Sequence, residues 1–167
     1  NQVFGTGTFL DTARMQRAVG QALNQDPKNV TGYVMGEHGE SQFTAWSTVR
    51  VAGHPIAEVA KENNLDLEDL DKQARRGGWL VFSGKRYTCY AIATCAIKLA
   101  LAVLSDAHLA CPASVYLEKY GCYVGYPAVI GAEGVVSVNY TELPAEEEEK
   151  LQSSAEFIAK KVKSLED

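Results

Sequence analysis

The sequence predicts an α+β domain in which antiparallel strands pack with long helices. Two observations lead to this prediction. Apolar residues recur at helical spacing near both ends of the 167-residue chain, and short alternating segments joined by glycine-containing turns lie between them. No internal repeat, low-complexity linker or boundary divides the chain. We therefore expect one domain over residues 1–167, a length that can bury a substantial core.

Four segments of the first half have patterns that predict secondary structure. In order, they are a helix over 10–23, strands over 32–36 and 46–52, and a charged helical region over 58–76. Pro27 lies in the segment that closes the first helix, and residues 53–55 are expected to form a turn. The helical region should break near Asn63-Asn64 and end at Gly77-Gly78.

The second half predicts two helices around three strands. In order, these are a buried helix over 88–107, strands over 113–120, 123–130 and 135–140, and a last helix over 144–165. Thr88 is a natural N-cap for the first of these helices, which is too short to span a membrane. The run Glu146–Glu149 lies in the first turns of the last helix, where negative charge suits the helix dipole. The apolar stripe of that helix contains Leu151, Ala155, Ile158, Val162 and Leu165.

Composition argues against several classes of partner. A formal net charge of −5 disfavours binding to nucleic acid, and the basic residues between Lys72 and Arg86 have acidic neighbours, so we interpret them as a solvated face. No membrane segment and no signal peptide are visible. The four cysteines follow no CxxC spacing and the histidines no zinc-ligand spacing, so we expect no metal site. Reduced thiols in the cytoplasm are the expected state.

Asp11 and Arg14 are three residues apart and share one face of the first predicted helix. One interpretation is structural: Thr8 and Asp11 form a capping box, and Asp11 and Arg14 form a surface ion pair. The other is functional, because a guanidinium can donate two parallel hydrogen bonds to the planar carboxylate of a ligand. Spacing alone favours the structural interpretation.

His38 lies between glycines directly after a predicted strand, in the segment Gly36–Gly39. Flanking glycines allow a tight turn and leave the ring accessible, and imidazole exchanges protons readily near neutral pH. The alternative is an ordinary loop histidine. The segment Gly5–Gly7 is not a dinucleotide-binding fingerprint, because Leu10 stands where the third glycine is required.

Three segments in order carry a resemblance to a known family. They are G-T-G-T-F-L-D-T-A-R at 5–14, G-E-H-G-E-S at 36–41 and Y-T-C-Y-A-I at 87–92. They resemble the C-terminal, substrate-binding half of the NAD-dependent L-2-hydroxyacid dehydrogenases, the lactate/malate dehydrogenase family. The segment 46–56 is more similar to the L-2-hydroxyisocaproate dehydrogenases than to the common lactate enzymes. The resemblance covers essentially the whole chain and implies that family's C-terminal α+β fold, with the Rossmann domain absent.

The resemblance implies roles for five residues. His38 matches the catalytic histidine, which donates a proton to the carbonyl oxygen of a 2-oxo acid and takes it back in the reverse reaction. Asp11 matches the aspartate that orients this ring and raises its pKa. Arg14 matches the arginine that binds the substrate carboxylate through two hydrogen bonds. Thr88 matches a substrate-pocket position, and Ile92 matches a cofactor-binding position near the nicotinamide ring.

The resemblance also implies partners. The cofactor would be NAD, bound mainly by an N-terminal Rossmann domain of a longer dehydrogenase, so that this chain alone would not turn over. The family forms homo-dimers or tetramers. Gln16 and Thr31 stand where fructose-bisphosphate-activated relatives carry an arginine and a histidine, so no such activation is expected. The alternative is a non-catalytic binding or assembly module that uses the same fold.

Overall fold

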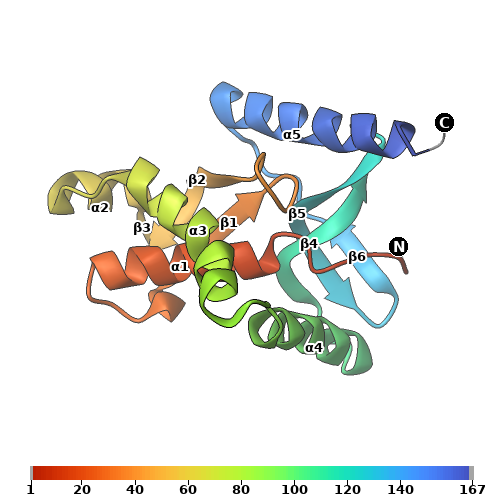
Figure 1. Ribbon diagram of the computed structural model, residues 1–167, viewed down its shortest axis with the longest axis horizontal. Helices are drawn as coiled ribbons and strands as arrows, with labels where there is room; N and C mark the ends of the chain where they lie inside the picture. The colour runs from red at the N-terminus through yellow and green to blue at the C-terminus, as the bar shows by residue number, and fades with distance from the viewer. Residues whose placement is uncertain (1, 166–167) are drawn as a thin grey trace.

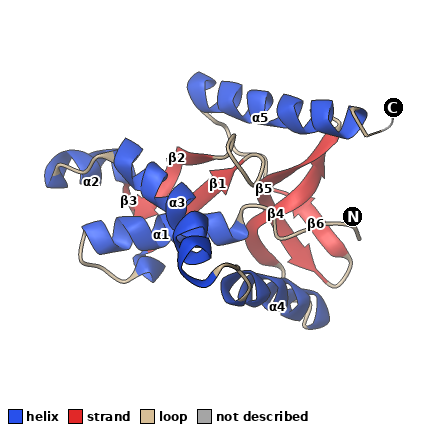
Figure 2. Cartoon of the chain, viewed as in Figure 1, coloured by secondary structure: helices blue, strands red, loops and turns tan. Residues whose placement is uncertain are grey.

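The computed structural model describes residues 2–165 and confirms the α+β class (Figure 1). In chain order the elements are α1 (Phe9–Ala22), the 3₁₀ turn η1 (Pro27–Asn29), β1 (Val30–Met35), β2 (Phe43–Val51), β3 (His54–Pro55), α2 (Ile56–Asn63), α3 (Leu67–Lys85), α4 (Tyr90–Leu104), β4 (Leu109–Leu117), β5 (Cys122–Gly131), β6 (Gly134–Val138) and α5 (Ala145–Lys163). Figure 2 shows the strands at the centre of the molecule, with helices around them. The expected break between two charged helices is present between α2 and α3.

The strands form two antiparallel three-stranded sheets, β1-β2-β3 and β4-β5-β6. The two sheets meet where β1 ends, because Gly36 and Gly125 exchange two backbone hydrogen bonds of 2.9 Å. Gly36 has φ +97°, which side-chain-bearing residues rarely adopt. A Cβ on Gly125 would lie 2.6 Å from Thr8 Oγ1 and 2.7 Å from the Gly36 carbonyl oxygen. Glycine is therefore required on both sides of this crossing, which fixes where the next loop, residues 37–42, leaves the sheet.

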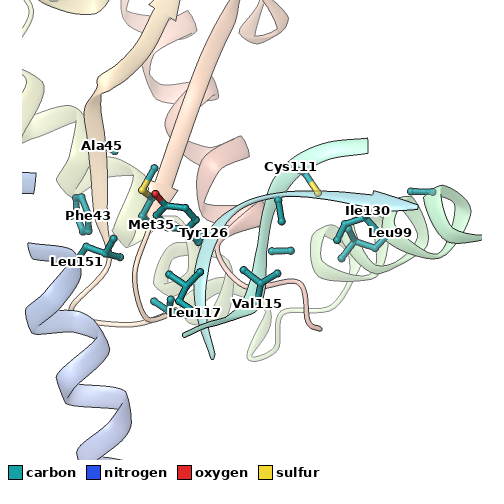
Figure 3. Close-up of a cluster of buried hydrophobic side chains, with 14 residues drawn as sticks. Met35, Phe43, Ala45, Leu99, Cys111, Val115, Leu117, Tyr126, Ile130 and Leu151 are labelled. Atoms are coloured by element: carbon teal, nitrogen blue, oxygen red, sulfur yellow. The ribbon is translucent and has the colours of Figure 1, made fainter. Parts of the chain in front are cut away.

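Two apolar clusters hold the fold together, and β1 contributes to both. Successive side chains of a strand point to opposite faces, so Val34 packs with α1, α2 and α3 while Met35 packs toward the second sheet. The apolar cluster that contains Met35 also includes Leu99 of α4, Ile130 of β5 and Leu151 of α5 (Figure 3). Helices α4 and α5, at opposite edges of the view in Figure 1, are thus tied to one core.

Three expectations about helix ends are wrong. Gly77-Gly78 does not end a helix, since α3 continues to Lys85. Thr88 does not cap α4, because the N-cap is Cys89, with no side-chain capping bond. Thr8 does stand at the N-cap of α1, but it forms no capping box. Its hydroxyl donates instead to the carbonyl oxygen of Val34, at 2.6 Å, and so ties α1 to β1.

Other differences concern burial and strand ends. The helix expected to be buried, α4, exposes an apolar face that includes Tyr90, Ile97, Leu101 and Leu104. On α5 the expected stripe is buried only at its start, since Val162 and Leu165 are exposed. Residues 54–55 form the short strand β3 rather than a turn, and β2 begins three residues earlier than expected. Within residues 2–165, we find no helix with the length and apolar character needed to cross a membrane.

The crossing of the two sheets gives a stability prediction. We expect Gly125→Ala to lower the free energy of unfolding by about 1–3 kcal/mol, because the new methyl group collides with Thr8 and the Gly36 backbone. Gly84→Ala in α3 is the matched control, since nothing lies within 4 Å of a Cβ there. It should leave stability unchanged or raise it by up to about 1 kcal/mol. Urea unfolding measures both, and equal stability of the two variants would contradict the prediction.

Candidate active site

Asp11, Arg14 and His38 are in direct contact. The Arg14 guanidinium donates to Asp11 Oδ1 at 2.8 Å, and Nδ1 of His38 lies 2.6 Å from Asp11 Oδ2. One carboxylate therefore holds both neighbours, one through each oxygen. The Asp11 side chain is only 2% exposed, whereas that of His38 is 59% exposed. Asp11 is thus not part of a surface ion pair, which is what the structural interpretation of the spacing required.

The burial of Asp11 makes its two partners necessary. Removing a carboxylate from water is costly unless it is paired and hydrogen-bonded, and here each oxygen has a cationic or N–H partner. Burial raises the pKa of Asp11, but the hydrogen bond from His38 and the charges of His38 and Arg14 outweigh that effect. The pKa of Asp11 therefore lies below its ordinary value.

The same contact sets the proton affinity and the orientation of His38. The hydrogen bond to Asp11 raises the pKa of His38 and outweighs burial and the charge of Arg14, which lower it. An ionised carboxylate only accepts hydrogen bonds, so Nδ1 carries the hydrogen that it donates to Asp11. Nε2 is then the ring nitrogen available for proton exchange with a ligand.

The loop that carries His38 is held from the side by α3. The Arg75 guanidinium donates to the backbone carbonyl oxygen of Glu40 at 3.1 Å and pairs with Asp71 on its own helix. Asp71 in turn accepts hydrogen bonds from the backbone and the hydroxyl of Thr44, at the start of β2. The basic residues of α3 are therefore not only a solvated face, because Arg75 connects the helix to the loop.

A cavity of about 370 Å³ opens beside these groups. It is lined by Asp11, Arg14, His38, Gly39, Glu40, Gln42, Arg75, Gly78, Trp79, Phe82 and Thr88. The structure thus brings four of the five predicted site residues to one cavity. The fifth, Ile92, is half-buried in the first turn of α4 and is not among the described residues that line it.

The glycine pair in α3 has a function at this cavity that sequence reasoning missed. A Cβ on Gly77 would lie 3.0 Å from Cδ of Arg14, and one on Gly78 would lie 3.3 Å from its Nη2. Glycine inside a helix costs about 1 kcal/mol relative to alanine, and here it makes room for the guanidinium. The sequence signal is two adjacent glycines in a helical pattern, which is equally typical of a helix end.

The effector and metal expectations can be compared with the local structure. The amide of Gln16 donates to the carbonyl oxygen of Val30 at 2.9 Å, and Thr31 is exposed, so these positions present no positive charge. Across residues 2–165, no group of three or more His, Cys, Asp or Glu side chains is arranged to hold a metal ion.

Comparison with known proteins identifies the family. A family model of the lactate/malate dehydrogenase alpha/beta C-terminal domain matches residues 8–167. The chain belongs to the lactate/malate dehydrogenase family. Among curated relatives of this chain, L-lactate dehydrogenase 1 of Lactococcus lactis subsp. lactis is 36% identical over 162 residues, which cover 92% of the chain and 50% of the relative. L-lactate dehydrogenase 2 of Clostridium acetobutylicum is 38% identical over 173 residues, with coverage of 99% and 54%.

Solved dehydrogenase structures show the same fold. A lactate dehydrogenase from a Medee basin deep-sea metagenome library matches with a TM-score of 0.92 and 30% identity, over 99% of this chain and 55% of that one. The minor L-lactate dehydrogenase of Enterococcus mundtii, in its ligands-bound form, matches with a TM-score of 0.89 and 30% identity, over 94% and 52%. The chain therefore spans about half the length of the dehydrogenases it matches.

The Asp11–His38 contact gives a pH prediction. Because Asp11 raises the pKa of His38, the imidazolium persists to a higher pH than in an isolated histidine, and the stability of this charged pair is lost as the pH rises through that raised pKa. We expect Asp11→Asn to lower the pKa of His38 toward its ordinary value. NMR titration of the His38 ring measures this. Asp69→Asn, on the exposed start of α3, is the control and should leave the titration unchanged; equal titrations in both variants would contradict the prediction.

Proposed function

We propose that this chain is the C-terminal, catalytic half of an NAD-dependent L-2-hydroxyacid dehydrogenase, which reversibly reduces a 2-oxo acid. The observation that supports this most strongly is the shared carboxylate: Asp11 holds Arg14 and His38 side by side at one cavity. A guanidinium can bind the carboxylate of a 2-oxo acid, and a protonated imidazole can reach its carbonyl oxygen. Membership of the lactate/malate dehydrogenase family supports the same reaction.

In the proposed mechanism each group has a separate task. The Arg14 guanidinium binds the substrate carboxylate through two hydrogen bonds and so orients the reacting carbon. Nε2 of His38 donates its proton to the carbonyl oxygen, which becomes the hydroxyl group, and takes that proton back in the oxidation direction. Asp11 keeps the ring oriented and favours its protonated form. The nicotinamide cofactor, when bound, supplies or accepts the hydride.

The described residues are suited to the nicotinamide end of such a cofactor rather than to the whole molecule. Ile92 is a half-buried apolar side chain only four residues from Thr88 of the cavity, which suits an apolar ring rather than a phosphate. Gly5 lies antiparallel to β4, where it pairs with Ser114, so the glycines near the N-terminus are used in packing. We propose that an N-terminal Rossmann domain binds most of the NAD.

The apolar surface of α3 and α4 supports this division. Trp79, Leu80 and Phe82 of α3 are exposed, and Tyr90 is 72% exposed on the neighbouring helix. Patches of this kind on a soluble domain usually mark an interaction surface. We propose that this apolar surface is covered in the complete enzyme by the N-terminal domain or by another subunit of a homo-dimer or tetramer. We also propose that the enzyme acts in the cytoplasm.

The same exposed surface supports the second candidate function, a binding or assembly module that acts without the dehydrogenase reaction. The module would keep the fold and the apolar face but would not need the paired Asp11 and His38. Activity of the complete protein decides between the two, because a module should show no reduction of any 2-oxo acid in the presence of NADH.

We expect the complete protein that carries this chain to reduce aliphatic 2-oxo acids with NADH. A panel of pyruvate, oxaloacetate and 2-oxoisocaproate measures kcat/KM for each acid. The named relatives support pyruvate, whereas the aromatic side chains of Trp79 and Phe82 in the cavity lining support a longer aliphatic side chain such as that of 2-oxoisocaproate. No turnover of any of the three acids would overturn the proposed function.

Two substitutions test the assigned roles. His38→Ala should lower kcat by about 10²–10⁴-fold, the usual contribution of a general acid, with binding of the acid less affected. Arg14→Lys should mainly raise KM, by at least about tenfold, because a lysine cannot make the two-pronged contact. Arg17→Lys on the same helix is the control and should retain the parent kinetics. Near-parent kinetics in His38→Ala and Arg14→Lys would exclude both roles.

A further inference from the structure

Ser154 of α5 lies under the loop that carries His38, although 116 residues separate the two in sequence. Its side chain is fully buried. The backbone N–H of Glu37 donates to Ser154 Oγ at 2.7 Å, directly beside His38. A Cβ on Gly36 would lie 2.7 Å from the same oxygen, which shows how closely α5 approaches the end of β1.

The loop is also closed on itself by the side chain of Glu37. One carboxylate oxygen, Oε2, accepts from the backbone N–H of Ser41 at 3.1 Å and from the Ser41 hydroxyl at 2.8 Å. The Glu37 carboxylate lies against Gly39, where any Cβ would overlap it. His38 therefore lies within a loop segment whose ends, Glu37 and Ser41, are bound together.

The two contacts join into a ring with a defined direction. Ser41 Oγ and Ser154 Oγ lie 2.9 Å apart. Because the carboxylate of Glu37 only accepts, the Ser41 hydroxyl donates to it, and the Ser154 hydroxyl must then donate to Ser41. The Ser154 hydroxyl thus accepts a hydrogen bond from the backbone N–H of Glu37 and donates one to Ser41 Oγ.

We propose that Ser154 is a positioning residue for the reaction: through this ring it holds Nδ1 of His38 against Asp11. The proposal rests on the proposed function, in which His38 is the proton donor. Asp11 is fixed on α1 and Arg14 beside it, so the position of His38 depends on its loop. That loop is held on one side by Arg75 of α3 and beneath by Ser154 of α5. A small displacement of a reacting group can cost up to about 100-fold in rate.

The test compares Ser154→Ala with Ser153→Ala in the complete protein. Ser153 is the adjacent serine of α5, is exposed, and serves as the matched control. In Ser154→Ala we expect kcat for 2-oxo acid reduction to fall about tenfold, with KM for the acid changed less than about twofold, because Arg14 is untouched. The pH at which kcat declines should also move lower, because a looser bond to Asp11 raises the pKa of His38 less. Ser153→Ala should match the parent in all three.

A purely structural role predicts a different result. Ser154→Ala would then lower Tm while kcat and the pH profile stayed at parent values, and this outcome overturns the proposal. If Ser154→Ala does not fold, Ser41→Ala breaks the same ring from the loop side. Ser41→Ala should shift the pH profile in the same direction, and a parent-like profile in that variant also overturns the proposal. Where both single variants fold, the double variant should be no slower than the slower of them, since each already opens the ring.

NMR titration of the His38 ring separates this proposal from the proposed function. Its pKa should be lower in Ser154→Ala than in Ser153→Ala whether or not the protein reduces 2-oxo acids. Absence of turnover in the unmodified protein would therefore contradict the proposed function. The titration would still test whether Ser154 positions the His38 ring. Equal pKa values in the two serine variants, with normal turnover in both, would remove the positioning inference alone.

Discussion

The site depends on one buried carboxylate that is shared between a guanidinium and an imidazole. Asp11 could not remain ionised at 2% exposure without partners, and it is hydrogen-bonded to both Arg14 and His38. Arg14 is fixed to it by helical spacing, whereas His38 comes from a loop 27 residues away. The arrangement is self-consistent, because the charge that costs free energy to bury is also the charge that raises the pKa of His38.

Because His38 lies on a loop, its position depends on contacts between that loop and other elements of the fold. The paired glycines of the sheet crossing fix the start of the loop, α3 holds its middle through Arg75, and α5 reaches it through Ser154. The elements that make these contacts come from both halves of the chain, and they pack in both apolar clusters. Because a small error in the position of a reacting group is costly, such over-determined support is what proton transfer requires.

Local pattern predicted the parts of this arrangement that depend on near neighbours in sequence. The helical period placed Asp11 and Arg14 on one face of α1, and the glycines around His38 predicted an exposed ring. The same reasoning was wrong where a distant element decides. Thr8 looks like a helix cap, yet it bonds to Val34, and Gly77-Gly78 looks like a helix end, yet it makes room for Arg14. The helical period places Ser154 on the buried face of α5 beside Leu151, but it does not indicate that the hydroxyl contacts the loop, because that loop lies more than 100 residues away in sequence.

The division of labour in the proposed enzyme follows from this geometry. The groups that we propose bind an acid and move a proton are on α1 and in the loop after β1, so they are oriented by this domain's own core. Trp79 and Phe82 of α3 line the same cavity and are exposed, so a nucleotide-binding domain that covers them must leave Arg14 and His38 undisturbed. The link of the loop to α5 meets that condition, because Ser154 is fully buried and lies on neither of these helices. We therefore expect the acid and base groups to be preorganised within this domain, and we expect turnover to require the hydride-carrying partner.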